Sequence, residues 1–245
     1  MALKTRAARA SSKPIARVPT GVPGLDSLIE GGFKKGSIIT VSGDPGSGKT
    51  TLAMQYLYNG ITKYGEPGIF VSLEQPKQSL YEDMARYGWD LAELEKKGKL
   101  QILVLQQHEI EQFQNHELRV QSAIEELGAK RLVIDSVTSL IMSYPSKHRA
   151  RRGMLRLMDR LRSWNVTSVL TSESTTDVQG DVHSSFKIDF LSDAVIYLYN
   201  MRRQNYRLHS IEVVKMRGTS VNGKMCPLKF GKGGIEVFPG QTVFK

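Results

Sequence analysis

The amino-acid sequence predicts an α/β fold built on a mainly parallel, twisted β-sheet with helices on its flanks. From residue 38 onward, short apolar runs of strand length alternate with longer stretches of helical periodicity, which is the pattern of successive βαβ units. The first of these runs leads into a glycine-rich loop and then into a helical pattern, which is the order of a strand–loop–helix phosphate-binding unit.

The chain enters this predicted core through a short helix around Leu25, Leu28 and Ile29, which Gly31 and Gly32 close. Helical patterns follow the first four of five apolar runs that we expect as strands, and the five runs lie at residues 38–42, 68–72, 100–105, 131–135 and 167–171. Tight turns join four further strands, at residues 194–199, 208–216, 225–230 and 235–238. We expect this C-terminal part to be antiparallel, and to extend the sheet or pack beside it.

Length and composition favour a soluble protein with a single domain at residues 18–245 behind a tail at residues 1–17. Of the 245 residues, 40% are hydrophobic and 24% charged, and no apolar run approaches the roughly 20 residues that cross a bilayer. The N-terminus lacks the apolar segment of a signal peptide, so a cytoplasmic location and no membrane insertion are expected. The single cysteine, Cys226, and the five histidines show no metal-ligand spacing.

The net charge of +10 is concentrated in two places. The tail has no acidic residue before Asp26 and no hydrophobic periodicity, so it is expected to be disordered; its basic residues are Lys4, Arg6, Arg9, Lys13 and Arg17. The second concentration runs over residues 147–162 and is predicted to be a basic amphipathic helix, whose arginines at helical spacing are Arg149, Arg152, Arg156 and Arg160.

The motif GDPGSGKT at residues 43–50 follows an expected strand and precedes an expected helix, as a phosphate-binding loop requires. Its glycines permit a tight turn whose N–H groups converge on phosphate oxygens, and the helix N-terminus adds the positive end of its dipole. We expect Lys49 to reach the β- and γ-phosphates of ATP, and the Thr50 hydroxyl to bind Mg²⁺. The residues expected to contact ATP are Gly43, Asp44, Pro45, Gly46, Ser47, Gly48, Lys49, Thr50 and Thr51.

Acidic residues follow three of the expected strands. Asp135 ends the strand RLVID, where it would orient Mg²⁺ through water, although a strand-end Asp can also simply cap a helix. Glu74 follows the strand GIFVS and is our candidate for the base that activates the attacking water; the alternative is a solvated loop glutamate. Glu173 is a second acid at a strand end, and Thr171 or Ser172 beside it could hydrogen-bond the water or the γ-phosphate.

Five blocks of the chain, in order, are PTGVPGLDSLIEGGFKKGSIITVSGDPGSGKTTLAMQYL, IFVSLEQP, LVIDSVTSL, VTSVLTSE and VVKMRGT. Together they resemble the KaiC branch of the RecA-like ATPases over residues 18–240. The resemblance implies a RecA-like P-loop NTPase core that forms a homo-oligomeric ring, commonly a hexamer, with ATP between neighbouring subunits. The neighbour would contribute Lys215, Arg217 and Gly218, and a cation delivered in this way would stabilise charge on the transferred phosphoryl group. Without the resemblance, a basic strand end facing solvent would be preferred.

This chain departs from the family pattern at three points. Gln75 stands where family members usually carry a second acid after the one matched by Glu74, so slower hydrolysis is expected. Asp189 and Phe190 stand where one half of the tandem clock proteins has its phosphate acceptors, so autokinase activity is not expected at that point, although Ser184 and Ser185 lie nearby. The clock proteins carry two fused copies of the domain and this chain carries one, so no timekeeping role follows.

Two uses of the ATP are compatible with these residues. The favoured one is a switch, in which nucleotide state changes the affinity for a protein partner. The alternative is a DNA-dependent ATPase, since recombinases and helicases share the RecA core. The segment 174–187, where a DNA-binding loop would fall, is more acidic than basic and has one aromatic residue, which argues against that use. The arginines of 149–160 and the basic tail remain candidates for nucleic-acid contact.

Overall fold

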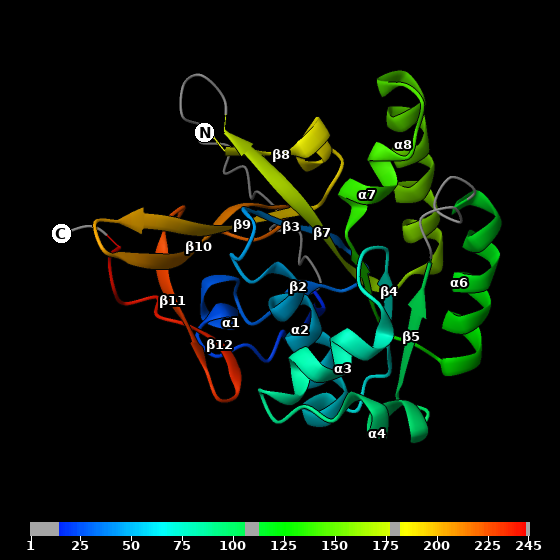
Figure 1. Ribbon diagram of the computed structural model, residues 1–245, viewed down its shortest axis with the longest axis horizontal. Coiled ribbons are helices and arrows are strands. Elements are labelled where there is room, and N and C mark those ends of the chain that lie inside the picture. Colours follow the sequence, from blue (N-terminus) through cyan, green and yellow to red (C-terminus); the bar gives the residue numbers. More distant parts are fainter. Residues whose placement is uncertain (1–14, 106–112, 177–181, 244–245) are drawn as a thin grey trace, which may run out of the picture.

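The computed structural model describes residues 15–105, 113–176 and 182–243. Its centre is a ten-stranded sheet with the order β12-β11-β10-β9-β3-β7-β6-β4-β5, and β8 (Val182–Ser184) pairs with β7 at its side (Figure 1). The parallel strands are β3 (Ile38–Gly43), β4 (Gly68–Ser72), β5 (Leu100–Val104), β6 (Arg131–Asp135) and β7 (Thr167–Thr176). The α/β fold with a mainly parallel sheet is therefore confirmed.

The C-terminal strands extend the sheet rather than packing beside it. They are β9 (Ala194–Arg203), β10 (Tyr206–Met216), β11 (Cys226–Gly231) and β12 (Gly234–Val237). The last three are antiparallel to their neighbours, as expected, but β9 lies parallel to β3 and so continues the parallel part by one strand. The crossover from β7 to β9 passes through β8 and the 3₁₀ helix at Ser185–Phe190, which returns the chain to the starting edge of β3.

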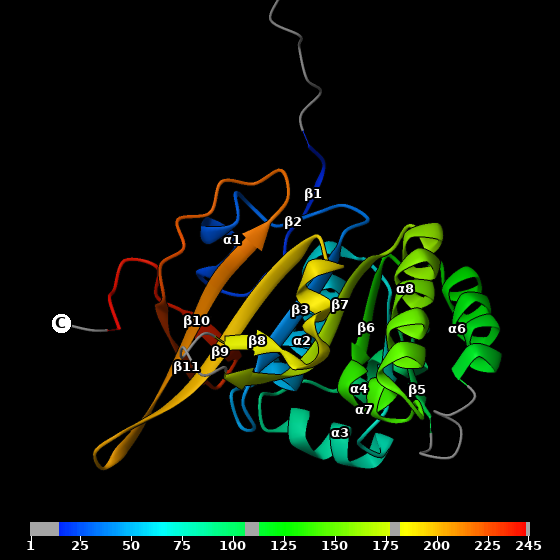
Figure 2. The same ribbon diagram turned by 90° about the horizontal axis from the view of Figure 1, so that it is seen from above.

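Helices cover both faces of the sheet (Figures 1 and 2). One face carries α1 (Leu25–Leu28), α2 (Lys49–Tyr64), α3 (Lys77–Ala85) and α4 (Leu91–Lys96). The other carries α6 (Phe113–Leu127), α7 (Val137–Met142) and α8 (Lys147–Trp164). Because successive strand side chains point to opposite faces, Ile39 packs into the core under α2 while Ile38 packs into the core under α8.

The expected basic amphipathic helix is α8. Met154, Leu157, Met158 and Leu161 are buried against the sheet, whereas its arginines are exposed. At the other end of the chain, residues 1–14 lie outside the described part, but Arg17 belongs to the fold. It lies in β1 (Arg17–Val18), which pairs with β2 (Phe33–Lys34), and its Nη1 donates to the carbonyls of Ile29 and Gly32 at 3.2 and 3.1 Å.

Among the described residues, none of the helices combines the length and apolar character that crossing a bilayer requires.

Candidate nucleotide-binding site

The glycine-rich loop lies between the end of β3 at Gly43 and the start of α2 at Lys49. Gly46 and Gly48 have φ angles of 75° and 99°, in the left-handed region that side chains rarely adopt. A Cβ on Gly43 would lie 2.3 Å from the carbonyl oxygen of Leu198, so the neighbouring strand also requires glycine there. These positions give the loop the tight turn that a phosphate-binding loop requires, directly before the N-terminus of α2.

The Lys49 side chain folds back along this loop. Its Nζ donates to the carbonyl oxygens of Gly43 at 2.8 Å and Asp44 at 3.1 Å. Burial lowers the pKa of Lys49, and this effect is opposed by nearby carboxylates, Asp135 first and then Glu173. The ammonium thus lies among acidic groups at the carboxyl edge of the parallel strands, where ligands of open α/β sheets bind.

Asp135 is at the end of β6 and only 6% exposed. Its Oδ1 accepts a hydrogen bond from Thr171 Oγ1 on β7, and its carboxylate lies near the Thr50 side chain at the start of α2. Burial raises the pKa of Asp135, while the hydroxyl groups of Thr171 and Thr50 oppose that rise. The structure therefore places the Thr50 hydroxyl and the Asp135 carboxylate side by side, and such hard oxygen donors suit Mg²⁺.

Glu74 follows β4 and is exposed at the same edge. Its Oε1 accepts from Ser139 Oγ at 2.6 Å and from Ser136 Oγ, and both serines come from the segment directly after Asp135. These bonds hold one carboxylate oxygen and leave the other without a protein partner among the described residues. The two serines belong to none of the motifs in the sequence, but their spacing of three residues at the start of α7 is a signal for side chains on one side of a helix.

Glu173 follows the expected strand in the sequence, lies within β7 in the structure, and is within electrostatic reach of Lys49. Its backbone N–H donates to Thr138 Oγ1 at 2.9 Å. The strand β7 continues to Thr176, beyond the expected end at residue 171, and Ser174 Oγ donates to Asp44 Oδ1 at 3.0 Å. Of the polar segment at 174–187, residues 177–181 lie outside the described part of the chain.

The C-terminal hairpin of β11 and β12 lies against the phosphate-binding loop, which sequence reasoning did not foresee. A Cβ on Gly48 would come within 2.7 Å of the Phe230 ring. Gln55 of α2 is buried and makes two bonds to Ile235: its Nε2 donates to the carbonyl at 2.9 Å, and its Oε1 accepts from the N–H at 2.7 Å. Asn200 on β9 also contacts the loop, donating to the Pro45 carbonyl at 3.2 Å.

Lys215 and Arg217 do not lie beside this loop. Lys215 Nζ donates to the carbonyl oxygens of Ser192 at 2.8 Å and of Asp189 at 3.1 Å, and burial lowers its pKa, with Arg217 adding to the effect. Arg217, 60% exposed, pairs with Asp193 at 3.5 Å, whose other oxygen accepts from the first amide of β3 at 3.0 Å. Gly218, with φ of 74°, follows. These residues therefore flank the start of β3, about 16 Å from the loop at its end.

The fold and the site together define a RecA-like P-loop ATPase. A family model described as "ATPase: KaiC" matches residues 18–242, and the chain belongs to the KaiC family. It is 35% identical to a KaiC-like protein from the hyperthermophilic archaeon Pyrococcus horikoshii, with a TM-score of 0.83 over 92% of this chain and 100% of that one.

The curated relatives are circadian clock oscillator proteins named KaiC. The protein from Parathermosynechococcus lividus is 38% identical over 96% of this chain and 44% of its own length, and that from Synechococcus elongatus is 36% identical over 92% and 44%. The chain thus spans about half the length of these relatives. Their shared family supports nucleotide binding and ATPase activity.

Proposed function

We propose that this protein binds MgATP at residues 43–51 and hydrolyses it to ADP and phosphate. In this proposal Lys49 binds the β- and γ-phosphates, Thr50 ligates Mg²⁺, and Asp135 orients the ion through a water molecule. The observation that carries the proposal is that Asp135, at the end of β6, lies near both Thr50 and Lys49 at the start of α2. When bound, Mg²⁺ would supply charge neutralisation on the phosphate oxygens.

Glu74 is the proposed general base. One of its oxygens is held by two serine hydroxyls, so the carboxylate has a fixed direction at the edge where the γ-phosphate would lie. The other oxygen is available to take a proton from a water molecule. Gln75, in place of a second acid, leaves this carboxylate without an adjacent like charge, and we expect slow turnover of the kind that suits a switch.

We further propose that Lys215, Arg217 and Gly218 complete the site of a neighbouring subunit in a ring, by analogy with the family a hexamer. Support comes from their position, because they flank the opposite end of β3 and cannot serve the loop of their own chain. Arg217 is exposed and has a long flexible side chain, which suits contact with a phosphate across a subunit boundary. Turnover would then depend on assembly.

Mixing two inactive variants tests the shared site. Lys49→Ala should fail to bind MgATP tightly in calorimetry, and Arg217→Ala should bind ATP but hydrolyse it poorly. Mixed assemblies contain some boundaries with an intact loop on one side and an intact arginine on the other, so part of the activity should return. Absence of rescue, after subunit exchange has been verified by native mass spectrometry, would refute the role of Arg217 across the boundary.

The ATP cycle is proposed to drive a change in affinity for a protein partner rather than movement on DNA. The test is ATP turnover by the full chain with and without single- and double-stranded DNA at near-physiological salt. Turnover that DNA leaves unchanged supports the switch. Stimulation of more than about tenfold at that salt would replace it with a DNA-dependent ATPase, because nonspecific charge contacts weaken steeply with salt.

A further inference from the structure

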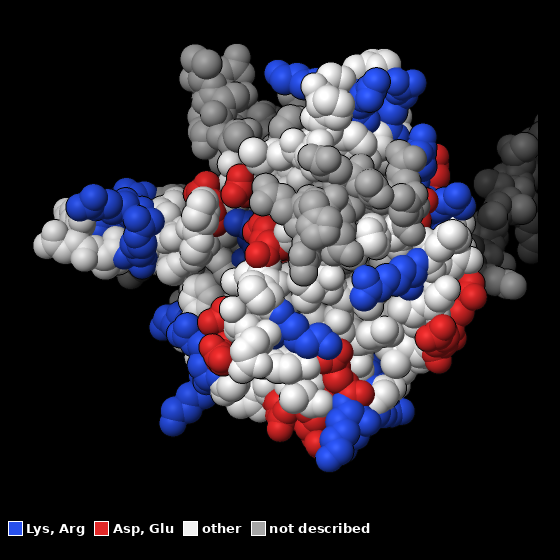
Figure 3. Space-filling model, turned by 45° about the vertical axis from the view of Figure 1, so that its right-hand side comes forward, with Lys and Arg blue, Asp and Glu red and all other residues white. Residues whose placement is uncertain are grey.

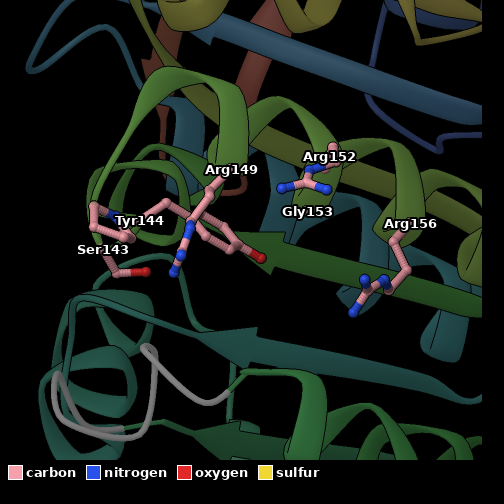
Figure 4. Close-up of a pocket in the computed structure, with 7 residues that line it drawn as sticks. Ser143, Tyr144, Arg149, Arg152, Gly153 and Arg156 are labelled. Atoms are coloured by element: carbon pink, nitrogen blue, oxygen red, sulfur yellow. The ribbon is translucent and has the colours of Figure 1, made fainter.

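A second hollow lies on the far side of α7 from the nucleotide site, between the end of α7 and the first half of α8. It has a volume of about 550 Å³, and its lining includes Ser143, Tyr144, Arg149, Arg152, Gly153 and Arg156 (Figure 4). The helix α7 has six residues, so about 9 Å of helix separates this pocket from the end of β6. None of its lining residues belongs to the nucleotide site described above.

Three arginines give the pocket its charge. Arg149, Arg152 and Arg156 are spaced three and four residues apart, which places them on one side of α8. Within the described part of the chain, none of their guanidinium groups has an ion pair or hydrogen bond, whereas Arg160 pairs with Glu117 at 3.1 Å and Arg162 with Asp159 at 3.5 Å. Among the described residues no carboxylate pairs with any of these three arginines; the Glu117 carboxylate, which pairs with Arg160, lies within electrostatic reach of Tyr144.

The start of α8 adds to this positive potential. The helix has 18 residues and begins at Lys147, with the Ser146 side chain accepting from the Arg149 N–H at 3.3 Å. Its N-terminus, the positive end of the helix dipole, thus points to the same side of the molecule as the first of the three arginines. In the space-filling view, Lys and Arg gather at the top of the molecule, over this end of α8 (Figure 3).

One wall of the pocket is formed by the packing of Tyr144 against α8. The Tyr144 ring lies under the backbone of α8 at Gly153, where a Cβ would stand 2.2 Å from the Tyr144 oxygen (Figure 4). Glycine weakens a helix interior relative to alanine, but here it allows the ring to approach the helix. The Tyr144 hydroxyl has no hydrogen-bond partner among the described residues, so the pocket combines guanidinium groups with a free hydroxyl and an aromatic wall.

We propose that this pocket binds a small phosphorylated molecule that carries at least two phosphate groups. Guanidinium groups match phosphate oxygens with paired N–H donors, and three of them balance two or more negative charges. The volume lies within the range of roughly 300–1,000 Å³ that small-molecule sites occupy. A nucleic-acid strand would instead need basic and aromatic groups arranged along an open groove.

The test is calorimetry with inorganic tripolyphosphate as the probe, on the full chain carrying Lys49→Ala so that the phosphate-binding loop is silent. One tripolyphosphate should bind per chain. Replacing Arg149, Arg152 or Arg156 by glutamine should weaken binding at least about tenfold for each, since each change removes charge-assisted hydrogen bonds. Arg151→Gln is the matched control, because Arg151 is exposed on the same helix but does not line the pocket, and it should change the affinity less than about twofold.

A second measurement needs no pocket variant. Tripolyphosphate should protect Arg149, Arg152 and Arg156 of the Lys49→Ala chain from modification by phenylglyoxal, read by peptide mass spectrometry, while Arg151 reacts at an unchanged rate. Absence of saturable binding, or equal weakening by Arg151→Gln, would overturn the proposal in favour of a solvated basic face. Binding of a 20-nucleotide single strand more than about tenfold tighter than tripolyphosphate, through the same arginines, would overturn it in favour of nucleic acid.

Discussion

Replacing Glu74 by glutamine removes a proton acceptor while leaving the local geometry in place. The glutamine side-chain oxygen can accept the same two bonds from Ser136 and Ser139 that Glu74 Oε1 accepts. Glu74 is exposed, and a substitution at such a position changes stability by less than about 0.5 kcal/mol, which is about 1–2 °C in Tm for a chain of this length. A loss of activity would therefore reflect chemistry and not folding.

The expected loss follows from the proposed role. A positioned general base contributes about 10²–10⁴ in rate, so the ATP turnover number should fall by that factor, equivalent to about 2.7–5.4 kcal/mol in activation free energy. The dissociation constant for MgATP should stay within about threefold, with any change toward tighter binding, because one carboxylate no longer repels the triphosphate.

The assay is phosphate release under saturating MgATP, with nucleotide affinity measured in parallel by calorimetry. Glu173→Gln is the matched control, because Glu173 is also an exposed acid near Lys49. Its turnover should fall less than about tenfold. If Glu74→Gln retains more than about a tenth of the wild-type rate, or if Glu173→Gln is the more damaging change, the assignment of the base to Glu74 is refuted.

Three further outcomes can be measured as stability or affinity. Burial raises the pKa of Asp135, so its charged form opposes folding at neutral pH; Asp135→Asn should raise Tm at pH 7 in calorimetry. The difference in Tm between the variant and the wild type should shrink as pH falls through the raised pKa, because the wild-type carboxyl then takes up a proton. A difference in Tm that grows toward acid pH would contradict this. Gln55→Ala leaves the N–H and the carbonyl of Ile235 without their partner, so it should lower the free energy of unfolding, measured in urea, by about 2–4 kcal/mol and should weaken MgATP binding. Unchanged MgATP affinity would show that the β11–β12 hairpin does not shape the phosphate-binding loop. Gly60→Ala should lower the free energy of unfolding by about 1–3 kcal/mol, although alanine favours helices, because its Cβ would lie 2.4 Å from the buried Arg131 side chain. In the Arg131→Met background this loss of stability should largely disappear.

The parallel core was predictable because each of its strands is a short apolar run bounded by clear turn signals. The run 131–135 coincides with β6, and 68–72 with β4. The direction of β9 was not predictable in the same way. Its own residues are compatible with either pairing, and its parallel alignment with β3 depends on the turn near Asp193, whose carboxylate accepts from the first amide of β3.

The loop at residues 43–50 could be read from spacing alone, since phosphate binding there depends on backbone shape and one helix end. Glu74 and Asp135 could be nominated only as strand-end acids, because their neighbours come from other strands. The contacts of Gln55 with Ile235, 180 positions apart in the chain, have no local signal at all. Contacts of this kind can be identified only from the tertiary structure, which brings the buried Gln55 amide beside the backbone groups of Ile235.

Asp193 holds two groups with one carboxylate, the first amide of β3 and the guanidinium of Arg217. The six-residue strand β3 ends in the phosphate-binding loop. In a ring with shared sites, each subunit would therefore bind one nucleotide with the loop at the end of β3 and contact the next nucleotide with Arg217, near the start of β3. Such a ring would have a direction: the two neighbours of any subunit would not be equivalent, and loss of a phosphate at one boundary would affect the strand that supports the next nucleotide.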